Sequence, residues 1–227
     1  MIDIARELEA VHREVADRTV PAGDAKAVIL EREYDAPIED VWDALTNPER
    51  IGRWFLPISG DYRLGGTYQF EGNAGGEIRE CDQPNRLKVT WVYGPVKSDA
   101  DISEVELRLS RAGDNRTHFV LEHTAVVPEE FWAMYGPGAV GVGWDLTLLG
   151  LSLHLATGVA KDDAEIEAWT TSDEGRLYFA TSSERWCAAS IEFGTDSGAA
   201  QAAAVRTTTF YAGVPSDNGS TEASTAL

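Results

Sequence analysis

Cysteine is scarce in this 227-residue sequence. Its two cysteines, Cys81 and Cys187, lie far apart and belong to no closely spaced set of cysteines and histidines. This pattern excludes a disulfide framework and gives no zinc motif, and we expect both thiols to be buried. The sequence therefore predicts no metal site and implies no cofactor.

Basic residues are also few. The chain has 19 lysines and arginines against 38 aspartates and glutamates, which gives a formal net charge of −19. No basic patch remains to neutralise phosphates, so we expect no nucleic-acid partner. An anionic membrane surface would repel such a protein. The charge predicts a well-solvated acidic surface.

Long apolar runs and targeting signals are missing too. The N-terminus has no basic segment followed by an apolar run, so it does not read as a signal peptide. The longest apolar stretch, residues 140–156, is interrupted by Asp145, Thr147, Ser152 and His154. It is too short and too polar to predict membrane insertion, and the cytoplasm is the expected location.

Common catalytic motifs do not occur in the sequence. There is no GxSxG, and the glycine pairs at 65–66 and 75–76 precede strand-like segments rather than helices. These glycines therefore predict turns and not a nucleotide-binding loop. No pair of carboxylates stands out by its spacing.

What is present is a clear sequence of helical and strand-like patterns. Ile4, Leu8, Val11 and Val15 have helical spacing, which predicts an N-terminal helix over residues 1–20. Residues 26–34 and then several short segments between 67 and 124 alternate as strands and are separated by turn residues. Closely spaced strands with tight turns predict an antiparallel meander.

A segment that is apolar nearly all round follows the strands. Residues 138–158 are long enough for about five helical turns and must be buried on most sides. A curved antiparallel sheet wrapped around one long helix would bury them. The sequence thus predicts an α+β fold whose main domain covers residues 21–158.

Residues 159–213 predict a helical extension. A capping signature at 171–174 precedes one helix, and Asp196 is placed to cap the last one. We expect the extension to pack on the same chain, against the N-terminal stripe. Residues 214–227 lack apolar periodicity and are predicted to be disordered.

Several segments together resemble a known family. They are "REYDAPIEDVWDALTNPERIGRWFLP", "DYRLGGTYQFEG", "GGEIRECDQPNRLKVTW" and "LEHTAVVP", followed by the tryptophan-bearing long helix. Over about residues 26–157 the chain is similar to the START-like helix-grip (SRPBCC) superfamily, in the branch named for the activator of the 90-kDa heat-shock-protein ATPase. The resemblance implies a cavity between the sheet and the long helix.

Strand parity and helix position then name a candidate ligand-binding lining. Its members are aromatic or lie on the long helix and the last strand: Trp54, Phe55, Tyr68, Phe70, Trp91, Tyr93, His123, Trp132, Trp144, Leu148 and Ser152. His123 has two readings, a pocket acid/base or a structural histidine. Asp145 and Ser152 share a helix stripe that either forms a polar groove, or faces solvent or pairs with an arginine such as Arg53.

Three functions stay open at this point. The first is a protein that binds a hydrophobic or aromatic small molecule in the cavity. The second is an enzyme resembling polyketide cyclases and aromatases, which would use the same cavity. The third is a co-chaperone-like module with a protein partner, and a homodimer is equally open.

Overall fold

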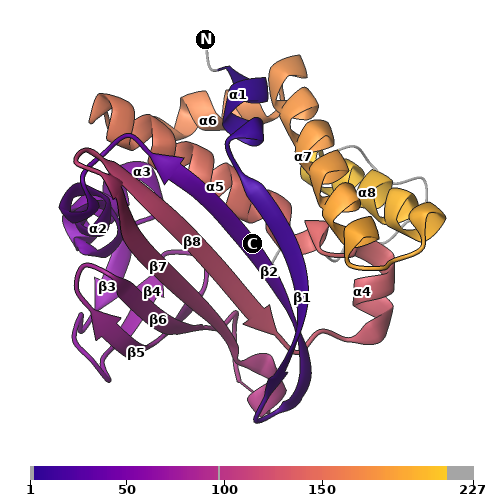
Figure 1. Cartoon of the computed structure of the whole chain (residues 1–227), viewed down its shortest axis with the longest axis horizontal. Helices are drawn as coiled ribbons and strands as arrows, with labels where there is room; N and C mark the ends of the chain where they lie inside the picture. The colour runs from indigo at the N-terminus through magenta and orange to yellow at the C-terminus, as the bar shows by residue number, and fades with distance from the viewer. Residues whose placement is uncertain (1–2, 97, 214–227) are drawn as a thin grey trace.

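The computed structural model describes residues 3–96 and 98–213, and the predicted disordered tail lies outside this range. Its centre is an eight-stranded antiparallel sheet in the order β1-β2-β8-β7-β6-β5-β4-β3 (Figure 1). The strands are β1 (His12–Val20), β2 (Gly23–Tyr34), β3 (Ile58–Gly60), β4 (Thr67–Phe70), β5 (Gly75–Asp82), β6 (Arg86–Trp91), β7 (Ser103–Gly113) and β8 (Arg116–Ala125).

The helices lie behind the sheet and at its sides, as Figure 1 shows, and its other face carries none of them. They are α1 (Ile4–Glu9), α2 (Ile38–Thr46), α3 (Pro48–Trp54), α4 (Glu129–Tyr135), α5 (Gly138–Thr157), α6 (Asp163–Thr170), α7 (Asp173–Glu192) and α8 (Ser197–Tyr211). We call the face against which α5 packs the inner face. The predicted α+β helix-grip architecture is confirmed.

Helix α5 is the core helix that the apolar segment predicts. It ends where Gly158 adopts a left-handed conformation, a common helix stop. Of the described helices, α5 is the one long and apolar enough to cross a membrane by length and composition. Its buried positions include Asp145 and His154, which are bonded to side chains of other elements, so α5 here is packed within protein.

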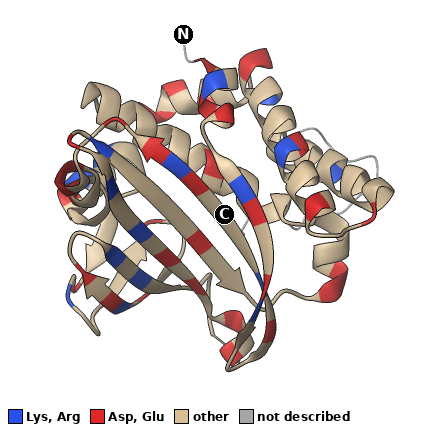
Figure 2. Cartoon of the chain, viewed as in Figure 1, with Lys and Arg blue, Asp and Glu red and all other residues tan. Residues whose placement is uncertain are grey.

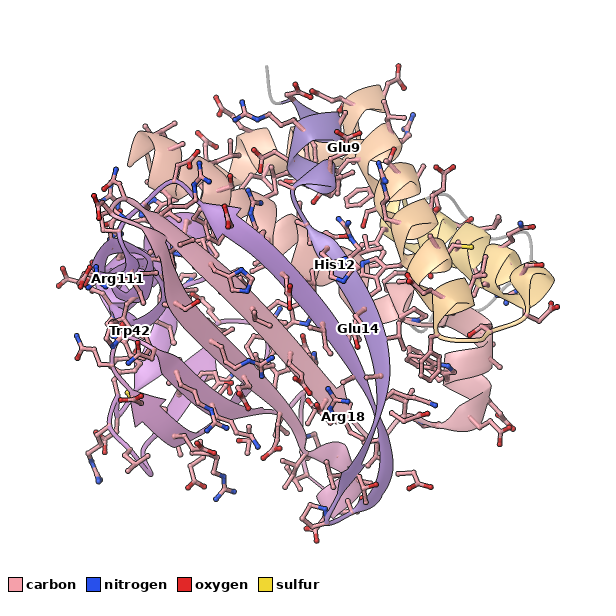
Figure 3. All side chains as sticks on the ribbon, viewed as in Figure 1. Glu9, His12, Glu14, Arg18, Trp42 and Arg111 are labelled. Carbon is pink, nitrogen blue, oxygen red and sulfur yellow. The ribbon has the colours of Figure 1, made fainter. Side chains whose placement is uncertain are left out.

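The prediction of a single N-terminal helix over residues 1–20 is wrong. Helix α1 ends at Glu9, and residues 12–20 form strand β1, paired antiparallel with β2. Arg13 and Val15 face inward and are buried, whereas the side chains of His12 and Glu14 are exposed (Figure 3). Pairing with β2 along residues 12–20, with Arg13 and Val15 buried, takes the place of the expected helix.

The helical extension packs back on the domain. Helix α7 contacts α5, β1 and α1, and Arg185 lies 3.7 Å from Glu9 of α1. A Cβ atom on Gly141 of α5 would overlap the indole of Trp186, so the two helices approach closely only because this position is glycine. Ser172 and Asp196 cap α7 and α8 as side-chain acceptors.

The strands carry charged residues of both signs (Figure 2), and a row of ion pairs runs across the outer face of the sheet. Glu122 of β8 accepts from Arg18 of β1 at 2.8 Å and from Arg108 of β7 at 3.3 Å. The row continues through Glu106 to Arg86 of β6. Opposite charges on adjacent strands stabilise a solvated sheet face.

The expectation of two buried thiols is also wrong. Cys81, near the end of β5, is exposed, and Cys187 of α7 is half-buried.

Candidate functional site

A cavity of about 180 Å³ lies between the inner face of the sheet and helices α2, α3 and α5. Most of its wall is apolar, with aromatic side chains from α3, β4, β6, β8 and α5 or their ends. The predicted residues that line it are Trp54, Phe55, Tyr68, Phe70, Trp91, Trp144 and Leu148. The structure thus brings seven of the eleven candidate residues to one space.

The aromatic side chains form a continuous wall. The rings of Phe55 and Phe70 meet edge to face with centroids 4.9 Å apart, and Tyr68 stands edge to face with Phe70 at 5.5 Å. The ring of Trp91 lies 5.0 Å from that of Trp144 on α5. Such contacts hold each ring in place, so the wall is preorganised.

Four candidate residues do not line the cavity. Tyr93 follows the end of β6 and is 42% exposed, packed edge to face on Trp91. Trp132 of α4 is half-buried, and its ring lies 5.8 Å from the ammonium group of Lys26. The other two, His123 and Ser152, are buried or half-buried, and both bond to neighbouring side chains.

Ser152 belongs to a polar seam on the other side of α5. Its hydroxyl lies 3.3 Å from Arg32 of β2, which also pairs with Glu7. Asp145, about two helical turns earlier on the same stripe of α5, pairs with Arg13 of β1 at 3.0 Å. The alternative of pairing with an arginine is therefore right, although the arginines are those of β1 and β2 rather than Arg53, and the stripe forms no open groove.

Asp145 is the most heavily bonded group of this seam. Besides Arg13, it accepts from the Ser182 hydroxyl at 2.5 Å and from the Trp186 indole at 3.0 Å, both on α7. Burial raises the pKa of Asp145, and the Arg13 guanidinium and these donors oppose that rise. The seam therefore joins β1, α5 and α7.

His123 sits behind the cavity wall. Its Nδ1 accepts from the indole of Trp144 at 3.0 Å, and its Nε2 lies 2.9 Å from the hydroxyl of Ser103. Burial lowers its pKa to about 4, so the ring is neutral near pH 7. Both nitrogens are used by protein partners, which is the arrangement of a structural histidine.

Polar groups of the interior are likewise occupied. Among the described residues, six side-chain donors of the lining are bonded to the protein: Tyr68 to Thr90 O at 2.7 Å, Trp54 to Ala44 O at 2.9 Å, Trp144 to His123, Thr46 to Trp42 O at 2.8 Å, Thr147 to Gly143 O at 2.9 Å, and Trp91 to the Tyr93 side chain. We call these groups the interior donors. The interior therefore presents ring faces and alkyl groups.

Sequence reasoning missed the mouth of the cavity. The exposed residues of the lining are Tyr62, Arg63, Leu64 and Cys81. Three of them lie in the loop between β3 and β4. The position of a loop depends on its tertiary contacts, so strand and helix patterns could not identify these residues. The alternation of Val105 and Leu107 in β7 was a usable signal for the wall opposite α5, and both line the cavity.

No cluster of three or more potential metal ligands occurs among residues 3–96 and 98–213. The lining itself, within the same range, contains no aspartate, glutamate, histidine or lysine. The cavity is therefore lined mainly by apolar groups, with the guanidinium of Arg63 and the thiol of Cys81 at its mouth.

The match to a family model covers residues 35–156, within the predicted main domain. The model describes the "Activator of Hsp90 ATPase homolog 1-like protein" family. The chain belongs to this family. Its matched segment runs from the end of β2 to the last turn of α5, and so contains most of the cavity.

Solved structures extend the similarity beyond that segment. The crystal structure of CalU16 from Micromonospora echinospora is 38% identical, with a TM-score of 0.60, over 79% of this chain and 98% of that one. Its solution structure is 36% identical over 82% and 97% of the two chains, with a TM-score of 0.64.

A more distant structure shares the fold. PFC0360w from Plasmodium falciparum, described as an HSP90 activator, is 20% identical over 60% of this chain and 99% of that one, with a TM-score of 0.50. A comparison with curated proteins finds no match.

Proposed function

We propose that this protein binds a small apolar molecule in the cavity between the sheet and α5. The observation that carries the proposal is the continuous wall of fixed aromatic rings around about 180 Å³ of space. A void of this kind leaves its lining without contacts on one side, which a ligand would supply. Membership of a helix-grip family supports the same reading.

The size of the cavity limits the ligand. Pockets for drug-sized molecules usually measure roughly 300–1,000 Å³. This cavity is smaller, at about 180 Å³. We therefore expect a compact ligand, such as a molecule with one or two fused rings or a short alkyl chain.

The geometry favours binding over the cyclase-like alternative. An acid/base residue must reach the substrate, and the lining offers no carboxylate, imidazole or amine among the described residues. The Tyr68 hydroxyl already donates to Thr90, and burial raises its pKa.

Two free thiols suit a reducing compartment, and we place the protein in the cytoplasm.

Calorimetric titration of the full chain with naphthalene, an uncharged two-ring hydrocarbon, tests the proposal. We expect saturable binding with one molecule per chain. Val105→Phe on the inner face of β7 should weaken it at least about tenfold, because the added ring occupies the cavity. Leu177→Phe, on the exposed side of α7, is the matched control and should bind as the natural protein does.

Absence of saturable binding, or equal binding by the Val105→Phe variant, would show that the cavity is not a ligand site. Circular dichroism and urea unfolding of both variants establish that each is folded before it is titrated. Native mass spectrometry of protein purified gently from its source then identifies the natural occupant.

A further inference from the structure

The cavity has a polar end and an apolar end. Away from the mouth, the interior donors are already bonded to protein acceptors. A polar group of a ligand would therefore be buried there without a partner. Burying an unpaired polar group is unfavourable, and burying an unpaired charge is far more so. Any polar group on the ligand is therefore directed to the mouth.

Arg63 is the charged residue of the mouth. Among the described residues that line the cavity, it is the only one with a formal charge. Its Nε donates to Asp61 at 2.6 Å, and Asp61 is the one carboxylate of the described chain within ion-pair distance. A guanidinium carries five N–H donors, so its terminal nitrogens can bind a second acceptor.

The loop that carries Arg63 has a defined shape. The amide of Gly66 donates to Arg63 O, and that of Arg63 to Asp61 O, each at 2.8 Å. Gly65 N and Gly66 O are both bonded to the backbone of Ile78 on β5, at 2.8 and 2.9 Å. A Cβ atom on Gly66 would overlap Asp61 O, so the turn depends on glycine. The backbone of Arg63 is thus held beside the opening.

We propose that the ligand is a small amphiphilic organic acid, with its apolar body against the aromatic wall and its carboxylate at Arg63. The inference rests on the proposed binding function and names the chemical class of the ligand. A guanidinium pairs with a carboxylate through parallel hydrogen bonds, and it repels a cationic head group. An aryl or an alkyl carboxylate would satisfy the same two ends.

Calorimetry of the full chain separates the head group from the body. The aromatic pair of probes is 2-naphthoate and 2-naphthylmethanol, and the aliphatic pair is octanoate and 1-octanol. Arg63→Gln removes the charge at the mouth. Arg79→Gln is the matched control, because Arg79 is an arginine of β5 that pairs with Glu77 and does not line the cavity.

We expect the acid of at least one pair to bind about fivefold more tightly than its alcohol, as fits one solvent-exposed ion pair. Arg63→Gln should abolish that preference, and Arg79→Gln should keep it. The pair that shows the preference identifies the body as aromatic or aliphatic.

Two other results would overturn the inference, and they are distinguishable. If neither acid binds more tightly than its alcohol, or if the preference survives Arg63→Gln, the organic-acid assignment is wrong while the binding function stands. If neither the acids, the alcohols nor naphthalene bind, the proposed function fails together with the inference.

Discussion

The indole N–H of Trp144 donates to Nδ1 of His123 across 3.0 Å, and this bond fixes the tautomer of the histidine. Nε2 then carries the proton and donates to Ser103, whose hydroxyl donates to Trp91 O at 2.5 Å. Trp144 and Trp91 both line the cavity. A neutral imidazole therefore connects two walls of the candidate site.

Acidification should weaken the fold through His123. Burial lowers its folded-state pKa to about 4, whereas the group titrates near 6.5 in an unfolded chain. The unfolded state binds the proton first, so the contribution is complete above pH 6.5 and is lost as the pH falls toward 4. The shift corresponds to a free energy on the order of 3 kcal/mol. Urea unfolding at a series of pH values measures it.

A variant isolates this contribution from the titration of carboxylates. His123→Gln can accept from Trp144 and donate to Ser103 without titrating, so its unfolding free energy should vary less between pH 7 and pH 4. His118→Gln is the control, because His118 lies on the outer face of β8 next to the inward-facing Phe119, and it should behave as the natural protein does. An identical pH dependence for all three proteins would rule out a buried neutral histidine here.

Much of the fold could be predicted because its signals are local. Alternation in β7 and β8 places Val105, Leu107, Phe119 and Leu121 on one face, and all four line the cavity. The segment that forms α5 is apolar nearly all round, so it had to be buried on most sides. Strand parity then found most of the aromatic wall, because a side chain's face in a strand follows from its position alone.

Strand β1 shows where local signals end. Val11 and Val15 are four residues apart, a spacing that places side chains on one face of a helix and also on one face of a strand. The choice depends on pairing with β2 and on Arg13 between them, which is buried because Asp145 lies opposite, 132 positions later. Nothing within the segment reveals that partner. The mouth loop was missed for the same reason, because Gly65 and Gly66 are bonded to Ile78 on another strand.

Asp145→Asn should destabilise the protein by about 3–5 kcal/mol, because it leaves the Arg13 guanidinium buried without a counter-charge. The double variant Arg13→Met with Asp145→Leu removes both charges and should recover much of that loss. Urea unfolding of the natural protein, Arg13→Met, Asp145→Leu and the double variant forms a double-mutant cycle, with Asp145→Asn measured beside it. A loss below about 0.5 kcal/mol for Asp145→Asn, the range of ordinary surface changes, would mean that the pair is not buried in solution.

Because Gly141 contacts Trp186, we expect Gly141→Ala to change stability in opposite directions in the natural protein and in the Trp186→Ala variant. On an unobstructed helix, Gly→Ala stabilises by about 1 kcal/mol. In the natural protein the new methyl group would overlap the indole, so Gly141→Ala should instead destabilise by about 1–3 kcal/mol. Trp186→Ala alone should cost about 3–5 kcal/mol, since it also removes a donor to Asp145.

Once Trp186 is removed, the obstruction is gone. Gly141→Ala in the Trp186→Ala background should therefore be neutral or stabilising, although the same change destabilises the natural protein. Thermal and urea unfolding of the four proteins measure the coupling between the two positions. Additive effects would show that α7 does not rest on α5 at this point, and stabilisation by Gly141→Ala in the natural background would show the same. The predicted reversal of sign requires that the extension be docked on the core helix, because only that contact makes a methyl group at residue 141 unfavourable.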